Sequence, residues 1–527
     1  MSDIVKNISN VEIKMPLMLI IAIMFAIYAL WFNFYTQWGM IDDHEVMLYL
    51  GYIRKWNMLD VFRSLHLTEI WNPGTSIRYR PFYYFFRLVE VCLWGGNPLF
   101  WYLFRFALFV ASFLIFWRIL LLYIKSVPSL LFTLYIFTFG FWSDIWTRLG
   151  PSETYAVLGF GLYSLGWLHA LKSVTLKDWI MMLTGAIIAM GSKENFLILL
   201  IPAFVLTIIL YKKGTLDKFG FFVFLVIFGF GGFIATAIGI AVGKTGHDIY
   251  NNSTNFVERI QLLAKGMENI WVIIPLVFVI VFFLFFYLPQ KKTPKAKDIL
   301  TTYLRYLLVL TIIFLFYLSQ FIFYNGVFPT HIRYDFPGVL AGPALLLSSV
   351  IFILNIVKLY AKKPINEALI ISVFSIGLII LNSGYGALRE ASKDHMFKTR
   401  YFTEEIMKLA NTLKKQPYAP FVLESDVSIK NWGEYEPLFS IPTFLAAYGV
   451  KNSFYCKLIG LPASFGLTLK DDLIKNLQHI SENGDDLFKP IKTLQKSSVC
   501  YSASFSDAKP TFNCKRIPLP LMSKSIF

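Results

Sequence analysis

The chain has 527 residues, of which 56% are hydrophobic and 18% aromatic, and its formal net charge at pH 7 is +16. A water-soluble protein cannot bury that much apolar surface, so the composition excludes an ordinary soluble enzyme and indicates a protein embedded in lipid. The basic excess lies mainly in short links between apolar runs, where lysine orients helices in a bilayer. It therefore indicates topology and contact with anionic membrane lipids, not nucleic-acid binding.

Apolar runs of roughly 15 to 25 residues recur along the chain and predict about eleven spanning helices. They cover residues 16–35, 97–123, 127–142, 154–171, 178–191, 196–211, 219–242, 270–288, 303–323, 337–359 and 366–383. The predicted fold class is therefore an α-helical polytopic membrane protein.

The link after the first predicted span, residues 36–96, carries the first conspicuous polar residues. Asp42-Asp43-His44-Glu45 lies near its start, and Arg78-Tyr79-Arg80-Pro81 lies further on. The apolar stretch that follows, residues 81–94, is too short to span a bilayer. It predicts an interfacial or re-entrant helix, and the first half of a kinked span is the alternative.

Three later links carry further polar clusters. These are Asp144 with Arg148 and Glu153, then Ser192-Lys193-Glu194-Asn195, and then His331 with Arg333, Tyr334 and Asp335. Ionisable residues close to spanning segments are costly, and they are therefore candidates for function. Arg105, inside the second predicted span near its outer end, is expected to reach a phosphate or the lipid headgroups.

Lysine marks the alternate links. If the N-terminus is cytoplasmic, the lysines of these alternate links lie inside: Lys6, Lys14, Lys125, Lys172, Lys177, Lys212, Lys213, Lys218, Lys291, Lys292, Lys295, Lys297, Lys358, Lys362 and Lys363. By the positive-inside rule, nearly all the clusters of acids and arginines then lie at the outer face, and the long link 36–96 is an exception to the pattern because it also carries several Arg and Lys. An odd number of spans places the C-terminus outside as well.

The chain changes character after about residue 384, where charges return and apolar runs shorten to strand length. We expect residues 1–383 to form the transmembrane domain and residues 384–527 to form a small soluble α/β domain outside the membrane. Cys500 and Cys514 have a spacing that a hairpin disulfide would close, and two unpaired thiols are equally compatible with the sequence.

The acidic pair has two chemical interpretations. Asp42 and Asp43 are suited to include a general base that deprotonates an acceptor hydroxyl. Alternatively, Asp43, with His44 beside it, supplies ligands for a divalent cation such as Mg or Mn. Solvated loop acids are the plain structural alternative.

The cations of the other clusters are suited to binding a phosphate group. Arg80, Lys193 and Arg333 are the candidates, with Tyr334 beside them and Arg148 in support. Glu153 and Glu194 are expected to orient these cations by ion pairing. Interfacial cations that reach the lipid headgroups are the alternative.

Together these residues resemble the GT-C superfamily of polytopic glycosyltransferases, and within it the transmembrane O-mannosyltransferases that carry tetratricopeptide repeats. The matched stretches are Asp42-Asp43, Tyr79-Arg80-Pro81, Phe86-Arg87, Gly96-Asn97-Pro98, Trp101-Tyr102, Ser192-Lys193-Glu194, and Arg333-Tyr334 with Pro337. The resemblance covers roughly residues 16–360. The sequence carries no tetratricopeptide repeats, so protein O-mannosylation does not follow from it.

The resemblance implies an inverting transfer of one hexose or pentose from a polyprenyl-phosphate donor, such as an undecaprenyl-phosphate sugar, at the outer leaflet. It implies that Asp42 is the base, that Asp43 assists or ligates a metal, and that Lys193 and Arg333 neutralise the departing lipid phosphate. Arg80 and Arg148 are second-tier candidates. The acceptor is a surface polysaccharide such as the O-antigen of lipopolysaccharide, a lipid, or a protein.

Two further possibilities remain open at the level of sequence. A transporter or flippase of lipid-linked sugars would need polar groups along a path through the bilayer and often has inverted repeats, and the sequence offers little of either.

We expect a bacterial inner membrane with a periplasmic C-terminal domain. An endoplasmic-reticulum origin is also open, because Asn251 and Asn252 begin glycosylation-type tripeptides.

Overall fold

The computed structural model of the chain describes residues 12–50, 56–68, 70–71, 73–74, 78–245, 261, 281, 296–323, 333–360, 364–417, 421–426, 436–452, 454–459, 500–505 and 515–517. The N-terminal helices are α2 (Met15–Leu30), η1 (Trp31–Tyr35), α3 (Asp43–Leu50), α4 (Met58–Ser64), η2 (Leu65–Leu67), α5 (Pro81–Trp94), α6 (Pro98–Leu121), α7 (Ser126–Phe137) and α8 (Trp142–Trp146). The central ones are α9 (Glu153–Lys172), α10 (Leu176–Ser192), η3 (Glu194–Leu199), α11 (Leu200–Lys213), α12 (Lys218–Thr245) and α15 (Ala296–Phe323).

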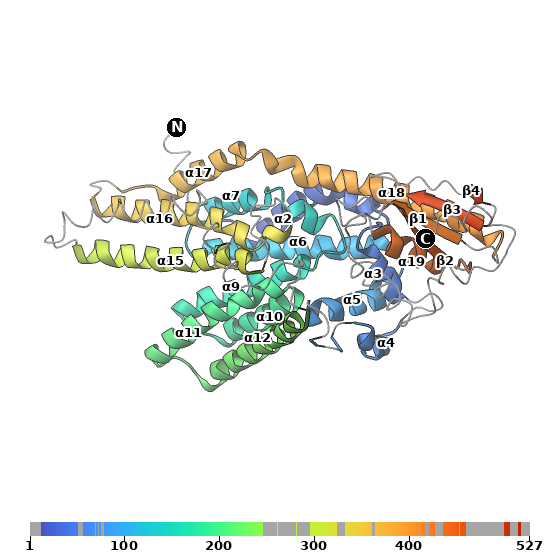
Figure 1. Cartoon of the computed structure of the whole chain (residues 1–527). Helices are drawn as coiled ribbons and strands as arrows, with labels where there is room; N and C mark the ends of the chain where they lie inside the picture. Colours follow the sequence, from blue (N-terminus) through green and yellow to red (C-terminus); the bar gives the residue numbers. More distant parts are fainter. Residues whose placement is uncertain are drawn as a thin grey trace.

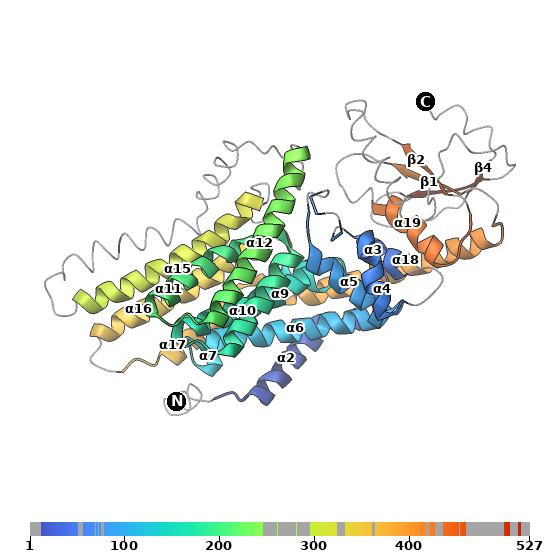
Figure 2. The same cartoon turned by 90° about the horizontal axis from the view of Figure 1, so that it is seen from below.

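The C-terminal part adds the only strands among the described residues. Its elements are η6 (Arg333–Asp335), η7 (Gly338–Leu340), α16 (Ala341–Tyr360), α17 (Glu367–Leu381), η8 (Ser383–Gly386), α18 (Ala387–Lys414), β1 (Phe421–Asp426), α19 (Glu436–Ala447), β2 (Phe454–Ile459), β3 (Cys500–Phe505) and β4 (Lys515–Ile517). Figures 1 and 2 show a long helix bundle with this small sheet, α3, α4 and α19 at one end, which we call the sheet end.

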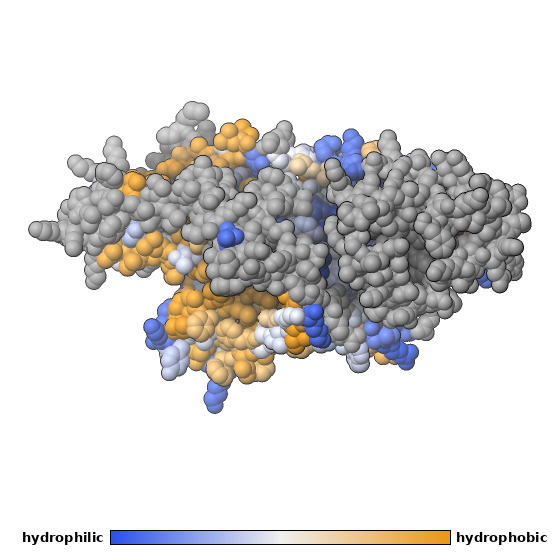
Figure 3. Space-filling view, in the orientation of Figure 1, coloured by the Kyte–Doolittle hydropathy of each residue, from blue (hydrophilic) through white to orange (hydrophobic). Residues whose placement is uncertain are grey.

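Six described helical segments are long and apolar enough to cross a membrane: Met15–Tyr35, Pro98–Leu121, Glu194–Lys213, Lys218–Lys244, Asp298–Tyr317 and Gly338–Tyr360. They match predicted spans, and the chain is an integral membrane protein. Helices α9 and α10 cover two further predicted spans. Figure 3 shows apolar residues over α11 and α12, with polar residues at the tips of these helices.

Three of the predicted spans differ from the structure or lie outside its description. The predicted span 127–142 is too long, because α7 ends at Phe137, where the Thr138 hydroxyl donates to the Tyr135 carbonyl at 2.7 Å. The helix of the predicted span 366–383 is the short α17, and residues 270–288 lie outside the described residues except for position 281. The count of eleven spans therefore stays a prediction.

Helices α9 and α10 pack backbone against backbone through glycine. A Cβ on Gly185 would lie 2.3 Å from the Tyr163 amide nitrogen, and one on Gly159 would lie 2.6 Å from the Ala189 amide nitrogen. Small residues permit this close approach, which is a common way of joining helices in lipid. The pairing fixes Glu153, at the start of α9, relative to Lys193, at the end of α10.

The described lysine-bearing links near residues 13, 122–126, 171–172 and 213 lie together at the end of the bundle away from the sheet (Figure 2). Lys6, Lys291, Lys292, Lys295, Lys362 and Lys363 lie outside the described residues. The Ile13 amide donates to the Ser126 hydroxyl at 3.1 Å, Lys172 Nζ donates to the Leu122 carbonyl at 2.9 Å, and Lys213 Nζ donates to the Leu171 carbonyl at 3.1 Å. These contacts join the links that flank α2, α6, α9 and α11. Among the described residues, these links therefore lie apart from the acid and arginine clusters, and the side of the membrane that each end faces stays a prediction.

The C-terminal sheet has the strand order β2-β1-β3-β4, with β1 parallel to both neighbours and β4 antiparallel to β3. Helices α18 and α19 share one hydrophobic core with the link 36–96 and with α6. That core includes Phe402, Ile406 and Phe444 from the C-terminal part, together with Trp38 and Trp101. The boundary at residue 383 stays a prediction. Cys500 lies in β3 and Cys514 lies outside the described residues, so the structure does not choose between a disulfide and two unpaired thiols.

The predicted short helix at residues 81–94 is present as α5. Pro81 occupies its first turn, where a missing amide proton costs nothing. Arg87 and Glu90 face the protein interior and form an ion pair at 3.4 Å. Arg105 joins them, with 3.0 Å between its Nη1 and Glu90 Oε1, and it is fully buried. The expectation that Arg105 reaches a phosphate or the lipid headgroups is therefore wrong, because Glu90 holds it inside the bundle.

Candidate active site

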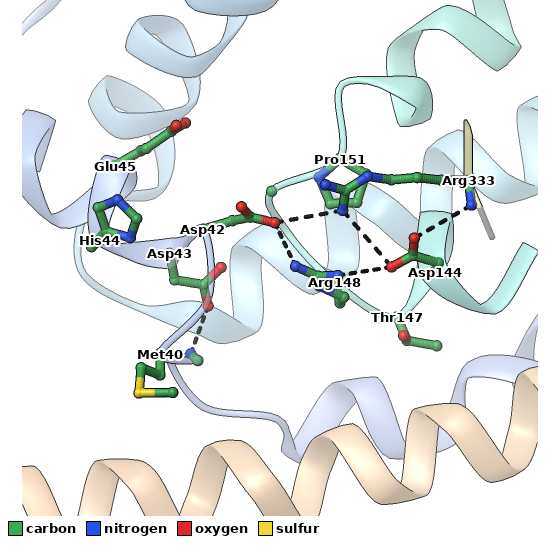
Figure 4. Close-up of polar contacts among 12 residues, drawn as sticks. Met40, Asp42, Asp43, His44, Glu45, Asp144, Thr147, Arg148, Pro151 and Arg333 are labelled. Carbon is green, nitrogen blue, oxygen red and sulfur yellow. Dashed lines mark hydrogen bonds and ion pairs between the residues drawn. The ribbon is translucent and has the colours of Figure 1, made fainter. Parts of the chain in front are cut away.

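The backbone at Asp42 separates the two neighbouring acids. Asp42 has φ +68°, the only positive φ at a non-glycine residue among those that the structure describes. Aspartate and asparagine tolerate this left-handed conformation better than most residues do, but it persists only where the surroundings hold it. As a result, Asp43 turns back to accept a hydrogen bond from the Gly39 amide at 2.6 Å, while Asp42 points toward the link between α8 and α9 (Figure 4).

Asp42 belongs to a cluster of four charged side chains. Its Oδ2 lies 2.6 Å from Arg148 Nη2 and 3.6 Å from Arg333 Nη1. Asp144 completes the cluster, 2.8 Å from Arg148 and 3.8 Å from Arg333 (Figure 4). The Asp42 side chain is 24% exposed and that of Arg333 is 16% exposed. A ligand group can therefore reach this cluster.

The surrounding charges decide the ionisation state of Asp42. Burial opposes ionisation of its carboxyl group, but the nearby positive charges, those of Arg148 and Arg333 foremost, outweigh this effect and lower its pKa below the ordinary value. Asp42 is therefore a carboxylate at neutral pH. Two arginines and two aspartates leave the cluster with no net charge, so an entering anion competes with Asp42 and Asp144 for the guanidinium groups.

A second ion pair extends the cluster into the bundle. Lys193 Nζ forms a hydrogen-bonded ion pair with Glu153 Oε1, and both side chains are buried. Arg333 Nε lies 3.9 Å from the same carboxylate oxygen. Both cations lie over the ring of Tyr334, each 5.2 Å from its centroid. Asp42, Arg333, Glu153 and Lys193 thus form one continuous chain of charges.

Arg80 and Glu194 form a bidentate pair, with distances of 2.8 and 2.9 Å between their nitrogen and oxygen atoms. This geometry suits a guanidinium and a carboxylate. It binds the start of α5 to the residue that follows Lys193. The structure therefore gives Arg80 a carboxylate partner, and the orienting role of Glu194 stays a prediction.

The acidic pair does not converge on one point as a metal site would require. Asp43 accepts from Gly39, and His44 Nδ1 lies 3.1 Å from the Ser440 hydroxyl. Among the described residues, no group of three or more His, Cys, Asp or Glu side chains is placed to hold a metal ion. The metal role of Asp43 and His44 stays a prediction.

Two members of the site have no role in the sequence-based assignment. Asp144, which the sequence places in a polar cluster without a role, bridges Arg148 and Arg333. It lies on α8, and Arg148 follows two residues after that helix ends. Gly150 is the second residue without a predicted role. It belongs to the site because the Asp42 side chain packs directly against it. Tyr83 holds the Gly150 segment in place, with its hydroxyl 2.9 Å from the Gly150 carbonyl and 3.1 Å from Glu45.

We expect Gly150→Ala to lower turnover by about 10²-fold, because a small displacement of a reacting group costs about that much. The added methyl carbon would lie 2.1 Å from Asp42 Cβ, so Asp42 must move away from Arg148. Gly96→Ala is the matched control, since a Cβ there has no neighbour within 4 Å. Initial rates of sugar transfer, the activity that the resemblance in the sequence implies, measure the effect. Equal rates for both variants would show that Asp42 tolerates displacement.

Burial raises the pKa of Asp43 to about 7 from an ordinary value of 3.8, although the Gly39 amide and Arg87 act in the opposite direction. The folded state therefore keeps a proton that the unfolded chain releases, and stability falls as the pH rises from about 4 to about 7. Asp43→Asn cannot ionise and still offers an oxygen to Gly39. We expect its Tm to exceed that of the natural chain at about pH 8 and to match it near pH 4. Parallel curves of Tm against pH would contradict this.

Comparison with known proteins gives a remote structural likeness. No family model matches the chain, and no curated protein matches it. The fold is similar to the crystal structure of ArnT from Cupriavidus metallidurans bound to undecaprenyl phosphate, with 11% sequence identity, 93% of each chain covered and a TM-score of 0.41. A likeness this remote leaves the function to be inferred from the site itself.

Proposed function

We propose that the protein is a membrane-embedded glycosyltransferase that moves one sugar from a polyprenyl-phosphate donor to an acceptor hydroxyl. The observation that carries the proposal is the continuous chain of charges in which Asp42 lies 3.6 Å from Arg333 and Arg333 lies 3.9 Å from Glu153, the partner of Lys193. A base and two cations in one partly exposed cluster suit the transfer of a group that leaves as a phosphate.

In this proposal Asp42 takes the proton of the acceptor hydroxyl while the hydroxyl oxygen attacks C1 of the sugar. The bond between C1 and the phosphate oxygen breaks at the opposite face, and the polyprenyl phosphate leaves with the electron pair, so the configuration at C1 inverts. Arg333 and Lys193 stabilise the negative charge that develops on the leaving phosphate.

The neutral cluster also explains how Asp42 becomes basic when the donor binds. In the free protein Arg148 and Arg333 both hold the Asp42 carboxylate, and this makes it a weak base. A lipid phosphate that binds Arg333 weakens this attraction and raises the affinity of Asp42 for a proton. Proton acceptance is thereby linked to the presence of donor.

The side of the membrane on which the site lies is inferred from the separation between the lysine links and the clusters of acids and arginines. Lysine-bearing links gather at the end of the bundle opposite the sheet, and the positive-inside rule places that end in the cytoplasm. Asp42 and the C-terminal sheet then face the outside, the periplasm of a bacterial inner membrane. Acceptors available there include surface polysaccharide such as the O-antigen of lipopolysaccharide, lipids and proteins.

The experiment uses the full chain in lipid nanodiscs and a panel of synthetic undecaprenyl-phosphate hexoses and pentoses. Mass spectrometry follows the release of undecaprenyl phosphate in the presence of cell-envelope glycan. We expect one donor to be cleaved and its sugar to appear on the acceptor. If proteoliposomes instead move an intact donor from one leaflet to the other, the protein is a transporter and the proposal is wrong.

A further inference from the structure

We propose that helices α18 and α19 are positioning elements for the acidic segment, residues 36–44, and thereby set where Asp42 lies. This inference deepens the function proposed above and rests on it. The residues concerned follow position 384, in the part of the chain that the sequence assigns to a separate domain.

The acidic segment needs partners for its backbone, because residues 36–42 form neither helix nor strand. Buried backbone groups without partners are costly, and a segment of this kind must obtain its hydrogen bonds from side chains or water. The structure supplies them from α18. The Thr399 hydroxyl accepts from the Gln37 amide at 3.1 Å, and the Thr403 hydroxyl donates to the Trp38 carbonyl at 3.2 Å.

Helix α19 holds the other half of the segment. The buried Ser440 hydroxyl donates to the Met40 carbonyl, and it lies 3.1 Å from His44 Nδ1. Helices α18 and α19 therefore form hydrogen bonds with residues of the segment on both sides of Gly39 and on both sides of Asp42. This arrangement can hold the left-handed backbone at Asp42, which requires support from its surroundings.

Packing around Gly39 leaves little room between the segment and α18. A Cβ on Gly39 would lie 3.3 Å from Asp43 Oδ2, 3.4 Å from Thr399 Cγ2 and 3.7 Å from His395 Cε1. Trp38 is buried beside it, with its ring 5.9 Å from that of Trp101. Because α18 packs against the segment at Gly39, it limits where this segment and the adjoining Asp43 can lie. Asp42 is bonded directly to Asp43, so its position is limited as well.

The test compares variants that lose one hydroxyl with little change of shape. Thr399→Val and Ser440→Ala, singly and together, remove the contacts to the segment. Thr412→Val is the matched control, because its hydroxyl bonds the Lys408 carbonyl of the same helix. Thr399→Ser restores the hydroxyl and serves as the conservative rescue.

We expect the double variant to lower kcat for release of undecaprenyl phosphate by about 10- to 100-fold, because a misplaced base slows the reaction without weakening donor binding. The KM of the double variant for the donor should stay within about twofold of that of the natural chain. Thr399→Ser should keep most of the kcat that Thr399→Val loses. Hydrogen exchange of the amides in residues 36–44 should quicken by about tenfold in Thr399→Val and stay unchanged in Thr412→Val.

The two readouts separate this inference from the proposed function. If the natural chain cleaves no donor of the panel, the proposed function fails, while faster exchange in residues 36–44 still supports the positioning role. Unchanged exchange in both single variants, together with natural kcat, overturns the inference. The single variants keep the test decisive if the double variant does not fold, since each breaks a different contact.

Discussion

Replacing Asp42 by asparagine is expected to lower donor turnover by about 10³-fold while the protein still folds and binds the donor lipid. Asparagine has nearly the same shape and tolerates the φ of +68° at this position, but it cannot take the proton of the acceptor. Donor affinity should be equal or higher, because Arg148 and Arg333 lose a competing carboxylate.

The measurement is the initial rate of undecaprenyl-phosphate release in nanodiscs, together with donor binding to the same preparation. Asp394→Asn is the control for loss of one negative charge, since Asp394 is 62% exposed on α18 and pairs with Lys398. A turnover within about threefold of the natural rate would remove Asp42 from the role of base. It would favour a transporter, which does not need that base.

Arg333→Met is expected to lower kcat/KM by about 10² to 10³-fold, the usual result of removing a group that stabilises developing charge. Arg333 lies near three carboxylates, those of Asp42, Asp144 and Glu153, and its side chain is partly exposed, so a donor phosphate can reach it. Methionine preserves much of the apolar stem and removes the charge.

Arg333 is a better target than Lys193, because Lys193 is fully buried and its loss would leave Glu153 without its partner inside the bundle. Arg63→Met is the matched control, since Arg63 lies on α4 of the first outer link and is 72% exposed. Equal values of kcat/KM for the two variants would mean that the donor phosphate binds elsewhere.

Much of the site could be predicted because charges stand out in an apolar sequence. Asp42, Arg148, Glu153, Lys193 and Arg333 come from four separate links, and the positive-inside rule is enough to place them on one face. The structure then brings their side chains together. Helix α5 could also be predicted from the sequence, because its apolar run is too short to span a bilayer.

What the sequence could not reveal depends on backbone geometry and on contacts distant in the chain. The different directions of Asp42 and Asp43 follow from a single φ angle, and a loop glycine such as Gly150 gives no sign of the side chain that lies against it. The contacts of Thr399 and Ser440 with the acidic segment join residues about 360 to 400 positions apart. One sequence shows no pairing at that distance, so the C-terminal part looks like a separate domain.

The most direct test of the central claim is a structure of the full chain in nanodiscs with an undecaprenyl-phosphate sugar bound to the Asp42→Asn variant. The account predicts that the phosphate oxygens lie within hydrogen-bond distance of the Arg333 guanidinium and near Lys193, with C1 of the sugar facing residue 42. A phosphate bound among the lysine links at the opposite end of the bundle, or out of reach of Arg333, would contradict it.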